Sequence, residues 1–292
     1  MGALGLVLAL LAAASFGVGL SLQKRRAVAL PGLVRSPIAF ALAFFSDLRW
    51  LGASALVVAG WGFEFAALSR APVALVLPTA LSGIVLVAAL SSRWFGERLA
   101  RREWAGVAAC VAGVVAAAIP ATDGNPVVSA RFDPTALACA VGFLIVLAIA
   151  ALALGRRGRA VSFCLSFGAG FLYAASGSLT KALAVAASGP RSPAVILALV
   201  APLVVVSVAA VLVLQAAFQR GSATIAVAVS GAVSSFLPAT LGGAVFGESW
   251  PEGAAGAMRL GALAAMLAGF GLLIRPTVRL QAPAPSDAHR GS

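Results

Sequence analysis

The sequence predicts an all-α integral membrane protein with about nine transmembrane helices, arranged as two inverted four-helix repeats joined by a connecting helix. Three observations support this fold class. Hydrophobic residues make up 61% of the chain and charged residues 10%, and the mean hydropathy is +1.04, which leaves too little polar surface for a soluble domain. Apolar stretches of about 20 residues, the length that crosses a bilayer core of about 30 Å, recur throughout the chain. A short motif also occurs in both halves.

The apolar stretches predict the individual spans. They lie near residues 2–22, 50–68, 71–92, 103–120, 134–154, 160–182, 194–217, 223–245 and 254–274. We interpret the opening stretch as a retained first span and not as a secretory signal, because its positive charges follow the apolar run. The apolar patch at residues 38–45 has about half the length of a span, so we expect it to be an interfacial segment.

The distribution of charge predicts the orientation of the chain. The formal net charge is +12, and most of the 21 Lys and Arg residues fall in one set of alternate loops, for example at Lys24, Arg25 and Arg26. By the positive-inside rule these loops face the cytoplasm. The N-terminus is therefore expected outside and the C-terminus in the cytoplasm of a cell membrane. No basic face with interleaved aromatic residues is present, so nucleic acid is not an expected partner.

An internal repeat follows from matched segments. The triplet Phe-Gly-Glu at residues 95–97 returns at 246–248, and Leu-Gln-Lys at 22–24 is similar to Leu-Thr-Lys at 179–181. The predicted organisation is a first repeat at 1–120, a connecting span at 134–154, a second repeat at 160–275 and a disordered cytoplasmic tail at 276–292. Corresponding spans stand five apart, an odd number, so the halves cross the membrane in opposite senses, as in secondary transporters. Chance similarity between two Ala-, Val- and Gly-rich halves is the alternative.

One segment of the first half comprises residues 95–107, Phe-Gly-Glu-Arg-Leu-Ala-Arg-Arg-Glu-Trp-Ala-Gly-Val, and the apolar run after them. It resembles the short loop and following span of EamA-type proteins of the drug/metabolite transporter superfamily. The first half, with Leu-Gln-Lys-Arg at 22–25, Trp-Leu-Gly at 50–52 and Leu-Pro at 77–78, is also similar to NIPA-type magnesium transporters. The resemblance covers about residues 2 to 275. It implies a transporter and does not name the cargo.

Ionisable residues inside spans are the first candidates for a substrate-binding or coupling site, because an unpaired charge in the bilayer is costly. Glu64, Lys181 and Arg259 qualify, and all three are expected at a similar depth near the outer surface. A carboxylate flanked by two cations can form a gate or bind an anionic or zwitterionic group. The alternatives are a structural salt bridge, or cations that extend outward to lipid headgroups.

Further candidates lie on polar helix faces and near prolines. Tyr173, the only tyrosine, shares one face of its predicted span with Gly170, Gly177 and Lys181. Small residues at such spacing also allow close helix packing, which is the alternative for the glycines. Pro78, Thr79 and Ser82 in one span, and Ser234 near Pro238 in another, predict interrupted helices that expose carbonyl groups to a cavity; a kink without function is the alternative.

Three functional classes remain. The first is a transporter of a small metabolite or drug-like solute, with Glu64 as a proton-coupling carboxylate. The second is a transporter of magnesium or another divalent cation, although one membrane carboxylate beside cations is unlike a magnesium site. The third is a non-transport structural membrane protein.

The sequence predicts no catalytic set, cofactor or metal cluster, and the chain is not expected to be an enzyme. Its expected partners are the lipid bilayer and a small-molecule or ion substrate. The sequence leaves open whether it forms a homodimer.

Overall fold

The computed structural model describes residues 2–29, 37–68, 79, 82–96, 99–118, 132–155, 161–187, 193–247 and 253–273. Every regular element in these ranges is an α-helix, which confirms the predicted all-α class. The helices are α1 (Gly2–Ala27), α2 (Pro37–Phe45), α3 (Leu48–Leu68), α5 (Gly83–Phe95), α6 (Arg101–Ala118), α7 (Pro134–Gly155), α8 (Val161–Ala187), α9 (Pro193–Arg220), α10 (Ala223–Phe246) and α11 (Gly253–Leu273).

Five of the described helices are long and apolar enough to cross a membrane. They are the candidate spans Leu4–Ala27, Pro134–Gly155, Val161–Leu183, Pro193–Arg220 and Gly253–Leu273. The chain is therefore an all-α protein with apolar helices of membrane-spanning length. The count of about nine spans, the orientation and the inverted repeat stay predictions. The tail at 276–292 lies outside the described residues.

Two segments differ from a simple row of long spans. Helix α2 has 9 residues, too few to cross a bilayer core of about 30 Å, which agrees with the expectation that residues 38–45 do not span. Of the predicted span at 71–92, the structure describes a helix from Gly83 onward, and residues 71–78 lie outside the described ranges.

Helix α10 runs through Pro238 without a break, so the interruption expected near Ser234 is absent.

Glycine ends both helices that carry the Phe-Gly-Glu motif. Gly96 follows α5 with a φ of 65°, and Gly247 follows α10 with a φ of 66°. This left-handed conformation suits glycine, which has no Cβ, and lets the Gly96 N–H donate to the carbonyls of Ser91 and Ser92. The motif thus terminates a helix in each half.

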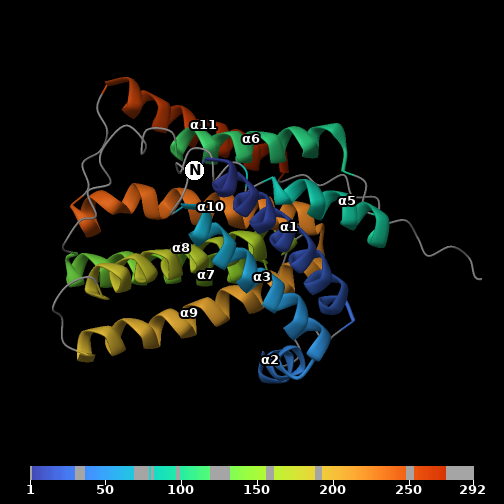
Figure 1. Ribbon diagram of the computed structural model, residues 1–292, viewed down its shortest axis with the longest axis horizontal. Helices are drawn as coiled ribbons and strands as arrows, with labels where there is room; N and C mark the ends of the chain where they lie inside the picture. Colours follow the sequence, from blue (N-terminus) through green and yellow to red (C-terminus); the bar gives the residue numbers. More distant parts are fainter. Residues whose placement is uncertain are drawn as a thin grey trace, which may run out of the picture.

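The helices pack in two similar groups and one separate pair. Helix α1 contacts α3 and α5, and α8 contacts α9 and α10 together with α7. Helices α6 and α11 lie side by side along one edge of the molecule, with α9 toward the opposite edge, while α1 and α3 cross the other helices at an angle (Figure 1). Helix α10 contacts helices of both groups and both helices of the pair, so it lies at the centre of the bundle.

Small residues allow the closest helix contacts. A Cβ built on Gly83 of α5 would collide with the backbone of Ala13 in α1. A Cβ on Gly269 of α11 would lie 2.8 Å from the carbonyl oxygen of Gly106 in α6. Within a membrane, such close backbone approach replaces the hydrophobic effect as the main source of helix association.

Candidate functional site

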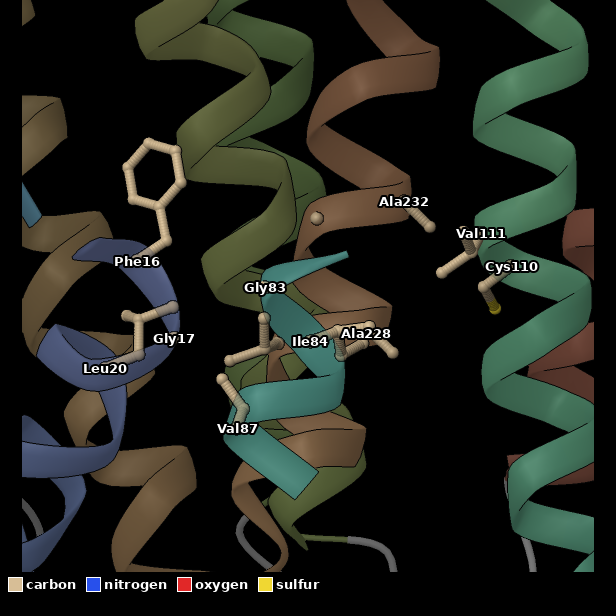
Figure 2. Close-up of a pocket in the computed structure, with 12 residues that line it drawn as sticks. Phe16, Gly17, Leu20, Gly83, Ile84, Val87, Cys110, Val111, Ala228 and Ala232 are labelled. Atoms are coloured by element: carbon tan, nitrogen blue, oxygen red, sulfur yellow. The ribbon is translucent and has the colours of Figure 1, made fainter. Parts of the chain in front are cut away.

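A cavity of about 180 Å³ lies between α1, α5, α6 and α10. Figure 2 shows side chains from these helices around it, including Phe16 of α1, Val87 of α5, Val111 of α6 and Ala228 of α10. Three of the helices belong to the predicted first repeat and α10 belongs to the second. The cavity therefore lies where the two halves of the chain meet.

The lining of this cavity is almost wholly apolar. The described residues around it are Gly, Ala, Val, Leu, Ile and Phe, with Cys110 as the one thiol among them. Dry apolar cavities of about 150 Å³ bind small aromatic molecules such as benzene. The space thus suits a small, neutral, largely apolar group better than an ion.

A chain of amide hydrogen bonds lies at the end of α1. Gln215 of α9 donates from Nε2 to Oε1 of Gln23 at 2.9 Å, and Gln23 in turn donates from Nε2 to Oγ of Ser54 in α3, also at 2.9 Å. Gln215 is fully buried and Gln23 is 4% exposed. Because buried amides are costly without partners, these bonds fix how α1, α3 and α9 meet.

Lys24, the next residue in α1, is also buried, with 3% of its surface exposed. Its Nζ donates to the carbonyl of Gly221 at 2.9 Å and lies 5.0 Å from the centroid of the Phe95 ring. Gln219 adds a further bond, from its Nε2 to the carbonyl of Ala27 at 2.7 Å. The last turn of α1 is thereby joined to the end of α9 and the loop before α10. We call this region the Lys24 end of the bundle.

Lys181 has a similar environment on α8. Its Nζ lies 4.4 Å from the centroid of the Phe246 ring, at the end of α10. Lys24 and Lys181 belong to the segments matched in the sequence repeat, and so do Phe95 and Phe246. Each lysine thus contacts the ring of the phenylalanine in one of the two Phe-Gly-Glu motifs.

Asp47 makes another junction at the Lys24 end. Its Oδ1 accepts hydrogen bonds from the backbone N–H groups of Arg49 and Trp50, and these two bonds cap the start of α3. Its Oδ2 accepts a hydrogen bond from Nε of Arg26 at 2.8 Å. The hydrogen bond from Arg26 holds the pKa of this carboxyl below its usual value, and the two backbone hydrogen bonds add to the effect. The contact joins α1 to the α2–α3 connection.

The predicted cluster of Glu64, Lys181 and Arg259 is only partly described. Glu64 is half-buried near the end of α3, and within the described ranges it makes no hydrogen bond or ion pair. Helix α3 packs against α1 and α2, whereas α8, which carries Lys181, packs against α7, α9 and α10. Arg259 lies in α11, and its side chain is outside the described set. As a joint site, the three residues stay a prediction.

The remaining predicted residues lie beside the cavity or away from it. Tyr173 packs against a cluster of buried apolar residues that come mainly from α7, α8 and α9. Ser82 Oγ donates to the carbonyl of Thr79 at 2.6 Å, immediately before Gly83 of the lining, and Ser234 Oγ donates to the carbonyl of Gly231, itself a lining residue. Pro78 lies outside the described residues. None of the described candidates is a lining residue of the cavity.

Sequence reasoning missed the buried amides and the cavity. Gln215 is a polar side chain inside an apolar run but is not ionisable, and Lys24 follows an apolar run, as a loop charge does. A search that included amides would have found Gln215. The cavity has no comparable signal, because its lining has the same composition as any lipid-facing or core position.

Comparisons with family models, with curated proteins and with solved structures found no match. Within the described ranges, no group of three or more His, Cys, Asp or Glu side chains gathers where it could hold a metal ion. The class that the structure defines is thus an all-α protein with apolar helices of membrane-spanning length and an apolar cavity between its first and second halves.

Proposed function

We propose that the chain is a multi-pass membrane transporter of the EamA type that moves a small organic solute by alternating access. The observation that carries the proposal is the cavity bounded by α1, α5, α6 and α10. Transporters built from repeats bind their cargo at the repeat interface, near the middle of the membrane. The cavity is lined by helices of both predicted halves, which supports this assignment.

The helix contacts support the inverted repeat on which the proposal depends. The α1 contacts with α3 and α5 correspond, in sequence order, to the α8 contacts with α9 and α10. The end of α1 meets Gly221 through Lys24, and a Cβ on Gly221 would collide with Ser162, in the first turn of α8. The end of α1 therefore lies near the start of α8, as expected if the corresponding helices run in opposite directions.

The cavity chemistry favours a neutral, largely apolar cargo. Its described lining residues provide no carboxylate, hydroxyl or amide side chain, and Mg²⁺ requires oxygen ligands in octahedral array. A divalent cation, the alternative suggested by the NIPA-type resemblance, finds no oxygen ligands among the side chains of these described residues. A purely structural membrane protein needs no such cavity between its halves.

Uptake into proteoliposomes, measured across a panel of small organic solutes and divalent cations, tests the proposal. Gly231→Leu is the informative variant, because Gly231 lines the cavity and a Cβ there meets no atom within 4 Å, so the added side chain begins in open space. Gly142→Leu is the matched control on the exposed face of α7, where a Cβ also meets nothing within 4 Å.

We expect at least one organic solute to be taken up by the native protein and by Gly142→Leu, with uptake reduced at least tenfold (about 1.4 kcal/mol) in Gly231→Leu. Uptake of divalent cations alone would favour the magnesium class. Uptake that Gly231→Leu leaves unchanged would place the cargo site elsewhere. No uptake of any solute would favour the structural class.

A further inference from the structure

The geometry points to the polar side chains at the Lys24 end as a gate that closes the cavity at that end and opens to water during transport. We define the gate as Gln23, Lys24, Ser91, Gln215 and Thr224. This inference rests on the proposed function, because a gate has meaning only if the cavity is reached from one side at a time.

Three of the gate residues, Lys24, Ser91 and Thr224, lie one helical turn beyond the cavity lining. Residues four apart on a helix share a face. Leu20 of α1 lines the cavity and Lys24 follows it by four. Val87 of α5 lines the cavity and is likewise followed by Ser91. On α10 the direction reverses, since Thr224 precedes the lining residue Ala228 by four. Three of the four helices around the cavity thus carry a gate residue on the same side of it.

The bonds at the gate join the two predicted halves. Gln23 and Lys24 lie on α1, whereas their partners Gln215 and Gly221 lie at the end of α9 and just after it, 192 and 197 residues along the chain. Ser91 and Phe95 of α5 share one face, and Lys24 covers the Phe95 ring. Separation of the halves at this end breaks these contacts, whereas the apolar contacts within each half can persist.

The gate is also only partly satisfied when closed. Three buried side-chain atoms in it, Ser91 Oγ, Gln215 Oε1 and Thr224 Oγ1, have no hydrogen-bond partner in the described part of the chain. Each such atom destabilises the closed arrangement and gains a partner when water enters. Opening an interface of this kind costs little free energy, whereas opening a well-packed apolar interface costs more. The closed state is therefore poised to open at this end.

The matched segments do not repeat the amide pair. Thr180 is the counterpart of Gln23 in the matched segments, and its hydroxyl donates to the carbonyl of Ser176 in its own helix. The counterpart of Gln215, at an offset of about 150 residues, is Phe65, which has no hydrogen-bonding side chain. The two ends are thus chemically different, and the inference is specific to the Lys24 end.

Labelling of a single cysteine in the cavity tests the gate without any cargo. The reporter is Gly231→Cys, placed in a protein with Cys110, Cys139 and Cys164 changed to Ala. Its reaction with a membrane-impermeant maleimide is followed in spheroplasts and in inside-out vesicles. A separate Val28→Cys reporter, exposed just beyond α1, identifies which preparation presents the Lys24 end.

Gln215→Leu removes the amide contact between the halves, and Gln23→Leu removes the same bond from the other side, should the first variant not insert into the membrane. Ser176→Ala is the matched control, since it removes the 2.7 Å hydrogen bond to Ser207 between α8 and α9, within one half. We expect either gate variant to label about fivefold faster from the Lys24 end, the factor for one hydrogen bond of ordinary net strength. The control should label at the native rate.

Three results would overturn the gate: an unchanged rate in both gate variants, an equal increase from both faces, or an equal increase in Ser176→Ala. The last two would indicate general loosening of the bundle. The outcome is separable from that of the proposed function. If no solute is transported but labelling changes as expected, the gate stands and the cargo proposal fails. If Gly231→Leu blocks uptake and labelling is unchanged, only the gate fails.

Discussion

The ammonium group of Lys181 lies 4.4 Å from the centroid of the Phe246 ring, and the same relationship joins Lys24 to Phe95 at 5.0 Å. In each pair, a lysine near the end of one long helix covers the phenylalanine that ends a second helix, just before a glycine with positive φ. A cation over an aromatic face is attracted by the ring quadrupole, and more strongly where water is excluded. The two pairs agree with the proposed relationship between the halves.

A double-mutant cycle on Lys181 and Phe246 measures this contact. Phe246→Leu in the native protein removes both the packing of the ring and the cation–π attraction. The same substitution made in a protein that already carries Lys181→Met removes the packing alone. We expect a coupling of about 0.5–2 kcal/mol in the free energy of unfolding, obtained from unfolding in detergent. The corresponding cycle on Lys24 and Phe95 should give a coupling of the same sign. A coupling near zero in both cycles would leave the rings as packing partners only.

Gly269→Ala should destabilise the contact between α6 and α11. The added Cβ would lie 2.8 Å from the Gly106 carbonyl oxygen and 2.7 Å from Cys110 Sγ, so the helices must move apart, at a cost of about 1–3 kcal/mol. Gly271→Ala, two residues along the same helix, is the control, because its Cβ meets no atom within 4 Å. That variant should be neutral or more stable by up to about 1 kcal/mol. Equal thermal midpoints for the two variants would contradict the close α6–α11 contact.

Asp47→Ala should lower stability more than Asp47→Asn. Asp47 caps α3 through two backbone N–H groups, and loss of an N-cap side chain costs about 1 kcal/mol. Asparagine retains an oxygen that caps the helix but loses the charge that Arg26 contacts. The difference between the variants in thermal unfolding isolates the cap. If both variants unfold alike, the cap is not what Asp47 contributes.

The Arg26–Asp47 contact also predicts a pH dependence. The pKa of Asp47 is lower in the folded chain than in the unfolded chain, so the unfolded chain takes up a proton first as the pH falls. The stabilisation is therefore complete above the unfolded value of about 3.9 and is lost as the pH falls through the folded value. Thermal midpoints between pH 3 and pH 7 should fall less steeply with acid in Asp47→Asn than in the native protein. Parallel curves would show that this carboxyl does not contribute.

Glu64→Gln tests the predicted proton coupling. Glu64 is the one acidic residue in the interior of the predicted spans, since Glu103 stands at the first position of its span, and Glu64 makes no ion pair in the part of the chain that the structure describes. We expect solute uptake driven by a pH gradient to fall at least tenfold in Glu64→Gln, because the amide cannot carry a proton, and to be retained in part by Glu64→Asp. Uptake unchanged in Glu64→Gln would remove proton coupling through that residue.

The sequence by itself determined the fold class and several helix ends. The apolar runs are local signals whose length is set by bilayer thickness, and they predict helices such as α7 and α9 closely. Gly96 and Gly247 mark the ends of α5 and α10, because a left-handed residue after a helix favours glycine whatever its tertiary partners.

The tertiary structure alone decided which helix faces meet. Gln23 and Gln215 are 192 residues apart, and neither has a local signal that names the other. The α6–α11 pair and the cavity likewise depend on small residues that come into register only when the helices pack. The physical reason is that lipid is as apolar as the protein core, so a hydrophobic pattern does not distinguish the buried face of a helix from its lipid-facing side. Close backbone approach and paired amides make that distinction, and both require the folded bundle.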